Sequence, residues 1–406
     1  MPRFLWTQRS NFGPSPRASH AVAYDSRRGR VVLFGGNPNQ PATFFGDTWE
    51  WDGSYWTQME DIGPAPRSGH AVAYDSSRQV TLLFGGAVAG ANKNDTWQWD
   101  GEVWTQLADS GPSPRFSHAM AFDTVRNTTV LFGGISSVNP EGVPSVLQDT
   151  WEFDGNVWTQ QEDAGPPGRG SHAMAFDVFS GRVVLFGGNP ARNDTWAWDG
   201  KTWVQIAEFG PPGRENAAVA ALPTGLVLFG GAASGIPFGD TWEFAGKLWI
   251  QKQDIGPKAR FGHALAFDSL RNMVVLFGGA AGDQGNVPSG FLGDTWEHQA
   301  EPAAPVSVAS LQIVPDQVRG GDTVEGTLTL NHAALTPTNV VITISSVPVT
   351  TTLLITIPSA SATFSTLFSA PVEPGLHPGQ NRDVGISAQV VGNGTPEATT
   401  SVRILA

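Results

Sequence analysis

The chain has no cysteine among its 406 residues. Disulfides, thiolate metal sites and cysteine nucleophiles are therefore excluded. Charge is also scarce: 15% of the residues are charged, with 24 basic against 37 acidic residues and a formal net charge of −13. Because binding to nucleic acid depends on clustered Lys and Arg, we expect no nucleic-acid partner. No apolar run approaches the roughly 18 residues of a membrane helix, so we also expect no membrane insertion.

The sequence contains 48 glycines and 30 prolines, and 40% of it is hydrophobic. This composition favours a turn-rich, all-β protein with a true core. Residues 1–10 lack the apolar core of a signal peptide. Two settings follow: the cytoplasm, or export with a leader removed ahead of this numbering.

A sixfold internal repeat dominates the sequence, and it has to be interpreted before any single motif. Each copy contains an Arg, a diglycine that ends an apolar run, and an Asp-Thr-Trp triplet. Five copies have a closing Trp seven residues after the Trp of that triplet, and the missing sixth one is found at the N-terminus as Trp6. The N-terminus is therefore predicted to supply the last strand of the sixth unit, which closes a ring and pairs an open edge.

Each unit is predicted to form four short strands separated by turn residues, as in 20–24, 31–34, 48–51 and 56–58 of the first copy. The succession of Arg, His, apolar strand, diglycine, aromatic strand and closing Trp resembles the kelch repeat, over residues 4–299. The resemblance implies a six-bladed kelch β-propeller in residues 1–299.

Only the segment between the diglycine and Asp-Thr-Trp varies freely in length, from 5 to 14 residues. In a four-stranded antiparallel unit these six segments share one rim, here called the loop rim, with the connections between units. Variable loops on a rigid scaffold commonly carry recognition, although tolerated decoration is the competing interpretation. The candidate binding residues are Phe44, Phe45, Asn92, Asn139, Glu141, Arg192, Phe238, Asp283, Gln284 and Phe291, with Glu215 added from the fifth copy. The four phenylalanines are expected to face solvent, where an exposed ring can anchor a partner.

Six repeated arginines are further candidates, because some of them could face the mouth of the channel and meet an anion. They are Arg17, Arg67, Arg115, Arg169, Arg214 and Arg260. Five histidines recur at one position of the repeat, and such regular spacing around a ring favours a structural role over metal binding. We therefore expect no metal site and no cofactor.

The fifth copy departs from the others on its first strand. It has Ala217, Ala221 and Leu222 where the other copies have His, Tyr or Phe, and Asp. The loss of two bulky groups would open a cavity there. The alternative is a degenerate repeat that its neighbours repack.

Catalysis is not favoured. Galactose oxidase, the kelch enzyme with a β-sandwich partner, needs a Tyr cross-linked to Cys, and this chain has no Cys and three Tyr. A sugar mutarotase-like or lyase-like site at the channel mouth stays open as an alternative, for example with Glu215 beside an Arg of the ring. No convincing catalytic constellation emerges from the sequence, so no residue is assigned a catalytic role.

Residues 300–305 read as a linker, and residues 306–406 shift to Val, Thr, Ser and Ile with no Trp or Tyr. Seven strand-like runs in about a hundred residues fit an immunoglobulin-like sandwich. The segment resembles the Ig-like modules of bacterial surface proteins. This resemblance implies an extracellular or cell-envelope setting, a spacer or docking role, and self-association through the domain.

The sequence thus predicts a non-catalytic protein that binds a glycan or a protein surface through the loop rim. The carbohydrate-active enzyme described above is one alternative. A structural subunit of a bacterial surface assembly is the other.

Overall fold

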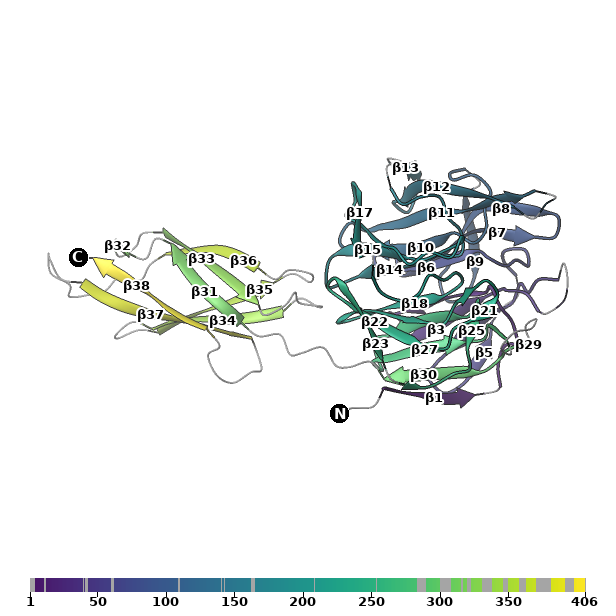
Figure 1. Cartoon of the computed structure of the whole chain (residues 1–406). Helices are drawn as coiled ribbons and strands as arrows, with labels where there is room; N and C mark the ends of the chain where they lie inside the picture. The colour runs from purple at the N-terminus through teal and green to yellow at the C-terminus, as the bar shows by residue number, and fades with distance from the viewer. Residues whose placement is uncertain are drawn as a thin grey trace. The chain divides into compact units, whose positions relative to one another are not determined.

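The computed structural model divides the chain into two units, Met1–Pro302 and Ala303–Ala406, and this division falls inside the predicted linker. Each unit is described by itself (Figure 1). The structure describes residues 4–10, 12–38, 40, 43–59, 62–108, 110–139, 141, 143–161, 165–207, 209–252, 254–282, 290–299, 308–314, 317–319, 323–330, 338–345, 350–357, 363–369, 381–390 and 398–405. Within these ranges the chain forms only strands and turns, and no helix long and apolar enough to span a membrane occurs.

Five sheets of the first unit have four antiparallel strands each, in chain order. The strands of these sheets are β2 (Ala21–Asp25), β3 (Arg30–Phe34), β4 (Thr48–Trp51) and β5 (Trp56–Gln58); β6 (Ala71–Asp75), β7 (Val80–Val88), β8 (Ala91–Trp99) and β9 (Trp104–Ala108); β10 (Ala119–Asp123), β11 (Thr128–Val138), β12 (Pro144–Phe153) and β13 (Trp158–Gln160); β14 (Ala173–Asp177), β15 (Arg182–Phe186), β16 (Thr195–Trp198) and β17 (Trp203–Ala207); and β18 (Ala218–Leu222), β19 (Gly225–Phe229), β22 (Thr241–Ala245) and β23 (Leu248–Lys252).

A further sheet joins the two ends of the unit. It consists of β26 (Ala264–Asp268), β27 (Met273–Phe277), β30 (Thr295–Gln299), β1 (Phe4–Ser10) and β24 (Asp254–Ile255). The N-terminal strand β1 pairs antiparallel with β30, as the repeat predicts, and parallel with β24. Short ladders on the loop rim are β20 (Ala232–Ala233) with β21 (Ile236–Pro237), and β25 (Arg260–Phe261) with β28 (Ala280–Ala281) and β29 (Gly290–Phe291).

The first strands of these sheets contact one another in a closed cycle: β2, β6, β10, β14, β18, β26 and β2 again. Just before each strand, one residue has a positive φ, and its N–H donates to the carbonyl of its equivalent in the preceding sheet, at 2.6–2.9 Å. These residues are Ser19, Gly69, Ser117, Ser171, Asn216 and Gly262. The bond from Ser19 to Gly262 closes the circle. An arrangement of antiparallel sheets about one axis is that of a β-propeller.

The diglycine joins neighbouring sheets. Gly35 has a φ of +65°, and a Cβ there would lie 2.7 Å from the carbonyl oxygen of Arg67 in the next sheet. The N–H of Gly36 donates to that same oxygen at 2.9 Å, and a Cβ on Gly36 would lie 2.8 Å from Cβ of His20. Both positions therefore require glycine, because no side chain fits and the backbone is left-handed.

Each closing Trp also crosses to the preceding sheet. Its indole N–H donates to the Thr of Asp-Thr-Trp, as in Trp56 to Thr295 at 2.8 Å and Trp6 to Thr241 at 3.1 Å. The Trp6 ring is 5% exposed and packs at 5.3 Å from the ring of Phe229. The N-terminal strand therefore supplies core packing as well as an edge.

The second unit has two sheets, and its described side chains include buried residues on both. One sheet contains β31 (Val308–Val314), β33 (Thr323–Leu330) and β36 (Thr363–Ser369); the other contains β32 (Gln317–Arg319), β38 (Ala398–Leu405), β37 (Asn381–Val390), β34 (Thr338–Ser345) and β35 (Thr350–Ile357). The short strand β32, which pairs parallel with β38, was not among the seven predicted strands.

Replacing Trp6 with Ala removes the indole bond to Thr241 and leaves a cavity, so we expect a loss of about 3–5 kcal/mol in the free energy of unfolding. Phe12→Ala is the matched control, because Phe12 is 89% exposed and its loss should cost less than about 0.5 kcal/mol. Chemical denaturation of both variants provides the measurement. Equal stabilities would show that β1 does not close the ring.

Candidate binding surfaces

The six repeated arginines lie in buried ion pairs. The guanidinium of each forms two hydrogen bonds with the Asp of the Asp-Thr-Trp triplet, as in Arg17 with Asp47 at 2.6 and 2.8 Å. It also donates to the first diglycine carbonyl, that of Gly35, at 2.9 Å. The same carboxylate accepts the indole N–H of Trp49 at 2.7 Å. The equivalent pairs are Arg67–Asp95, Arg115–Asp149, Arg169–Asp194, Arg214–Asp240 and Arg260–Asp294.

This geometry corrects the expectation that some of these arginines face the channel mouth. All six are fully buried, and none lines either of the channel pockets described below. Burial alone would raise the pKa of Asp47, but the hydrogen bonds and charge of Arg17 and the indole of Trp49 lower it. The carboxylate is therefore ionised, and the guanidinium is already committed to it.

At the loop-rim end, the channel has a polar pocket of about 110 Å³. It is lined by the circle of hydrogen-bonded residues and by His20, His70, His118, His172, Ala217 and His263. Each of these histidines packs edge-on against a Phe of the preceding sheet, with ring centroids 5.5–5.6 Å apart. Burial, and then the charge of the nearby Arg, lower the pKa of His70 to about 3. Within the described ranges, no three His, Asp or Glu side chains are placed to hold a metal ion.

The four candidate phenylalanines of the loop rim are half-buried and not open to solvent as the sequence suggested. The Cζ atom of Arg17 lies 4.0 Å from the centroid of the Phe45 ring, and the Cζ atom of Arg214 lies 4.1 Å from the centroid of the Phe238 ring. These stacked rings cover the buried ion pairs, and this contact explains why the two rings are half-buried. Phe291 lines a cleft of about 500 Å³ together with Lys258. Phe44 is half-buried as well.

The polar candidates mostly shape the loops that carry them. The Asn92 amide donates to the carbonyl of Ser136 at 2.9 Å, and the Asn139 side chain accepts from the N–H of Val143 at 2.7 Å. Glu141 is exposed beside that turn. Asp283 and Gln284 lie outside the described residues.

Glu215 and Arg192 occur on neighbouring loops at the fourth and fifth sheets. The Glu215 carboxylate accepts from the Asn189 amide at 2.5 Å. Arg214, its neighbour in sequence, is held by Asp240. Arg192 is half-buried, and its Nε has no hydrogen-bond partner among the described residues. The acid–base pair considered for an enzyme, Glu215 with an arginine of the ring, is therefore not assembled.

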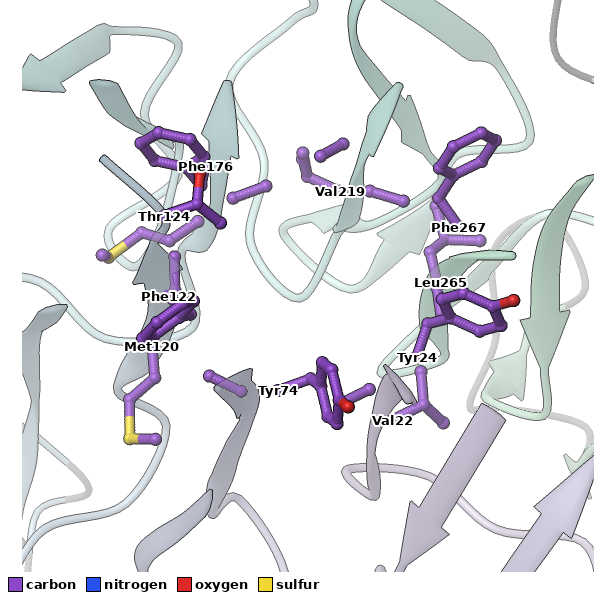
Figure 2. Close-up of a pocket in the computed structure, with 18 of the residues that line it drawn as sticks. Val22, Tyr24, Tyr74, Met120, Phe122, Thr124, Phe176, Val219, Leu265 and Phe267 are labelled. Carbon is purple, nitrogen blue, oxygen red and sulfur yellow. The ribbon is translucent and has the colours of Figure 1, made fainter. Parts of the chain in front are cut away.

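The opposite end of the channel has a feature that the list of candidates missed. A pocket of about 340 Å³ is walled by the first strands of the sheets, and aromatic side chains lie around it (Figure 2). The aromatic residues are Tyr24, Tyr74, Phe122, Phe176 and Phe267, and Ala221 has the equivalent place on β18. The sequence signal for this pocket is the fifth copy, in which alanine replaces the His and the aromatic residue of the other copies. In the structure, Ala217 lines the polar pocket and Ala221 lines this apolar pocket.

Three strongly exposed apolar residues were also missed. Phe12, Ile62 and Phe209 are 89%, 81% and 87% exposed. All three precede the Gly-Pro of a connection between sheets, so a position within the repeat could have identified them.

Comparison with known proteins agrees with this repeat and fold. A family model described as the KLHDC2/KLHL20/DRC7 Kelch-repeats domain matches residues 3–188. A solved structure titled "Structure of YjhT" is similar with a TM-score of 0.54 and 14% sequence identity, over 70% of this chain and 95% of that chain. No curated protein matches the chain. The first unit thus has the fold of a β-propeller, and its residues 3–188 match a kelch-repeat model.

Replacing Arg115 with Met leaves the partly buried Asp149 carboxylate without its partner, so we expect a loss of about 2–4 kcal/mol in the free energy of unfolding. Adding Asp149→Leu should restore much of that loss, because no charge is then left unpaired. Arg27→Met is the exposed control and should change little. Thermal and chemical unfolding test this; if Arg115→Met is as stable as the control, the pair is not structural.

Stability should fall as the pH is lowered from about 6.5 toward 3. The pKa of His70, His172 and His263 is lowered to about 3, and that of His20 and His118 is also lowered. Below about 6.5 the unfolded chain takes up protons that the folded chain does not. At one pH unit below about 6.5, each of these histidines should therefore lower the free energy of unfolding by on the order of 1 kcal/mol.

The measurement is the free energy of unfolding against pH, for the wild type and His118→Gln. The variant should show a slope shallower by about one proton between pH 5 and 6. Identical slopes would mean that His118 titrates in the folded state much as it does in water.

Proposed function

We propose that this chain is a non-catalytic binding protein, in which a six-bladed kelch propeller presents the loop rim to a protein partner. Kelch propellers are scaffolds for binding, and the likeness to other kelch repeats supports that general role. The choice of partner rests on one observation, the pair of long hairpins in the second and third sheets.

These hairpins are β7–β8 and β11–β12, whose strands have 9 to 11 residues against four or five in most equivalent strands. The bond from Asn92 to Ser136 joins them side by side. At the second hairpin Val138, Val143 and Val146 are 51%, 59% and 36% exposed. A rigid platform that offers aliphatic side chains, with its amides used internally, suits a protein surface better than a glycan, which needs free polar groups.

We further propose that the second unit is an Ig-like β-sandwich that acts as a spacer or docking unit. Its two sheets are consistent with that architecture. We propose with this assignment that the protein works in an extracellular or cell-envelope setting and that the domain mediates self-association.

The loop-rim proposal is tested with Val143→Asp in the full chain. The wild type is used to recover partners from extracts of the producing cell, and each purified partner is titrated against wild type and variant. Because a buried charge at an interface centre is unfavourable, we expect binding to weaken at least tenfold, about 1.4 kcal/mol or more. Melting temperatures should stay the same.

Val103→Asp is the matched control, since Val103 is 54% exposed in a turn at the other end of the sheets. A glycan array is run in parallel. Binding to glycans without a protein partner, or equal losses with both variants, would contradict the proposal.

A further inference from the structure

A second surface lies at the end of the channel away from the loop rim. Here the first strands end, and the turns between first and second strands and between third and fourth strands form what we call the hairpin rim. The pocket of about 340 Å³ opens at this end. Its size is near the lower limit of the usual range for small-molecule sites, about 300–1,000 Å³.

The lining of this pocket is apolar and aromatic. Five rings, from Tyr24, Tyr74, Phe122, Phe176 and Phe267, surround it, and the thioethers of Met120 and Met174 lie between them and the polar end of the channel. Figure 2 shows the labelled side chains arranged around an open centre. Rings and thioethers of this kind form favourable edge and face contacts with a bound aromatic ring.

The sixth position breaks the symmetry. Ala221 lies where the other five sheets place an aromatic ring, and Val219 precedes it on the same strand of the pocket wall. An alanine methyl occupies far less volume than a phenyl ring. The ring that the other five sheets contribute is therefore missing on one side of the channel, at β18.

The pocket has no ionised lining residue. Burial raises the pKa of both Tyr24 and Tyr74 to about 12, so both phenols are neutral. At the ends of the first strands, four carboxylates each pair with an Arg three residues later: Asp25–Arg28, Asp75–Arg78, Asp123–Arg126 and Asp268–Arg271. In the fourth sheet, burial raises the pKa of Asp177. Nothing in this lining favours a charged ligand.

Exposed apolar side chains occur in three of the six turns that follow a first strand. Val125, Phe179 and Leu270 are 49%, 44% and 79% exposed, and each belongs to a turn that follows a first strand. Val178 and Thr124, in the same turns, line the pocket itself. The apolar surface thus continues from the interior to the rim.

We propose that this pocket binds a small, uncharged aromatic molecule, with one ring seated in the space beside Ala221. The site is separate from the loop rim. A small ligand at the hairpin rim and a protein on the loop rim would occupy opposite ends of the propeller.

The probe is 2-naphthol, titrated into the full-length protein. We expect saturable binding to the wild type and at least tenfold weaker binding to Ala221→Phe, which fills the gap with the ring the other copies carry. Phe209→Ala, an exposed site between sheets, is the control and should bind as the wild type does. Naphthalene-2-sulfonate and a 2-naphthyl trimethylammonium ion should each bind at least tenfold more weakly than 2-naphthol.

Methyl spectra of the methionines provide a readout that does not depend on the variant folding. The chain has five methionines, and 2-naphthol should shift the methyl signals of Met120 and Met174 while leaving Met59 and Met273 in place. The proposal is overturned by unchanged Met120 and Met174 signals, by equal binding to a folded Ala221→Phe, or by tighter binding of either ion. None of these results bears on the loop-rim experiment.

Discussion

The structure of the propeller depends on a buried guanidinium–carboxylate pair that recurs in every repeat. One arginine, such as Arg17, joins three parts of the chain that are far apart in sequence: its own connection, the diglycine and the Asp before Thr-Trp. The planar fork matches a carboxylate in two parallel bonds, which a lysine does not. The Asp then positions an indole, so that a single ion pair orients the first, second and third strands.

The two ends of the channel differ because of which side chains the first strands present. At the beginning of five of the six first strands a neutral histidine lies behind a circle of backbone hydrogen bonds, and the pocket there is small and polar. Four residues later on these five strands an aromatic ring occupies the wall, and the pocket is larger and apolar. The propeller therefore offers surfaces of different chemistry at its ends, with separate ligands proposed for each.

The repeat allowed the sheets, the diglycine turns and the role of Trp6 to be predicted, because these depend on spacing alone. The site was harder. A repeated Arg67 has the same period whether it faces the channel or the next sheet, so spacing does not reveal its burial. The prediction that Phe45 faces solvent was wrong, because its contact, the Arg17 guanidinium, is 28 residues away in sequence. The sequence also singles out Ala221, yet only the structure shows that this residue lines the channel pocket.

The circle of six backbone hydrogen bonds has no first or last member. In an open array of repeats, the terminal units have one neighbour each and fray first, and they need special capping sequences. Here every sheet has two neighbours, including the one assembled from both ends of the unit. No sheet can leave by breaking a single interface. A change in the number of repeats would therefore require all the remaining sheets to adopt new angles at once.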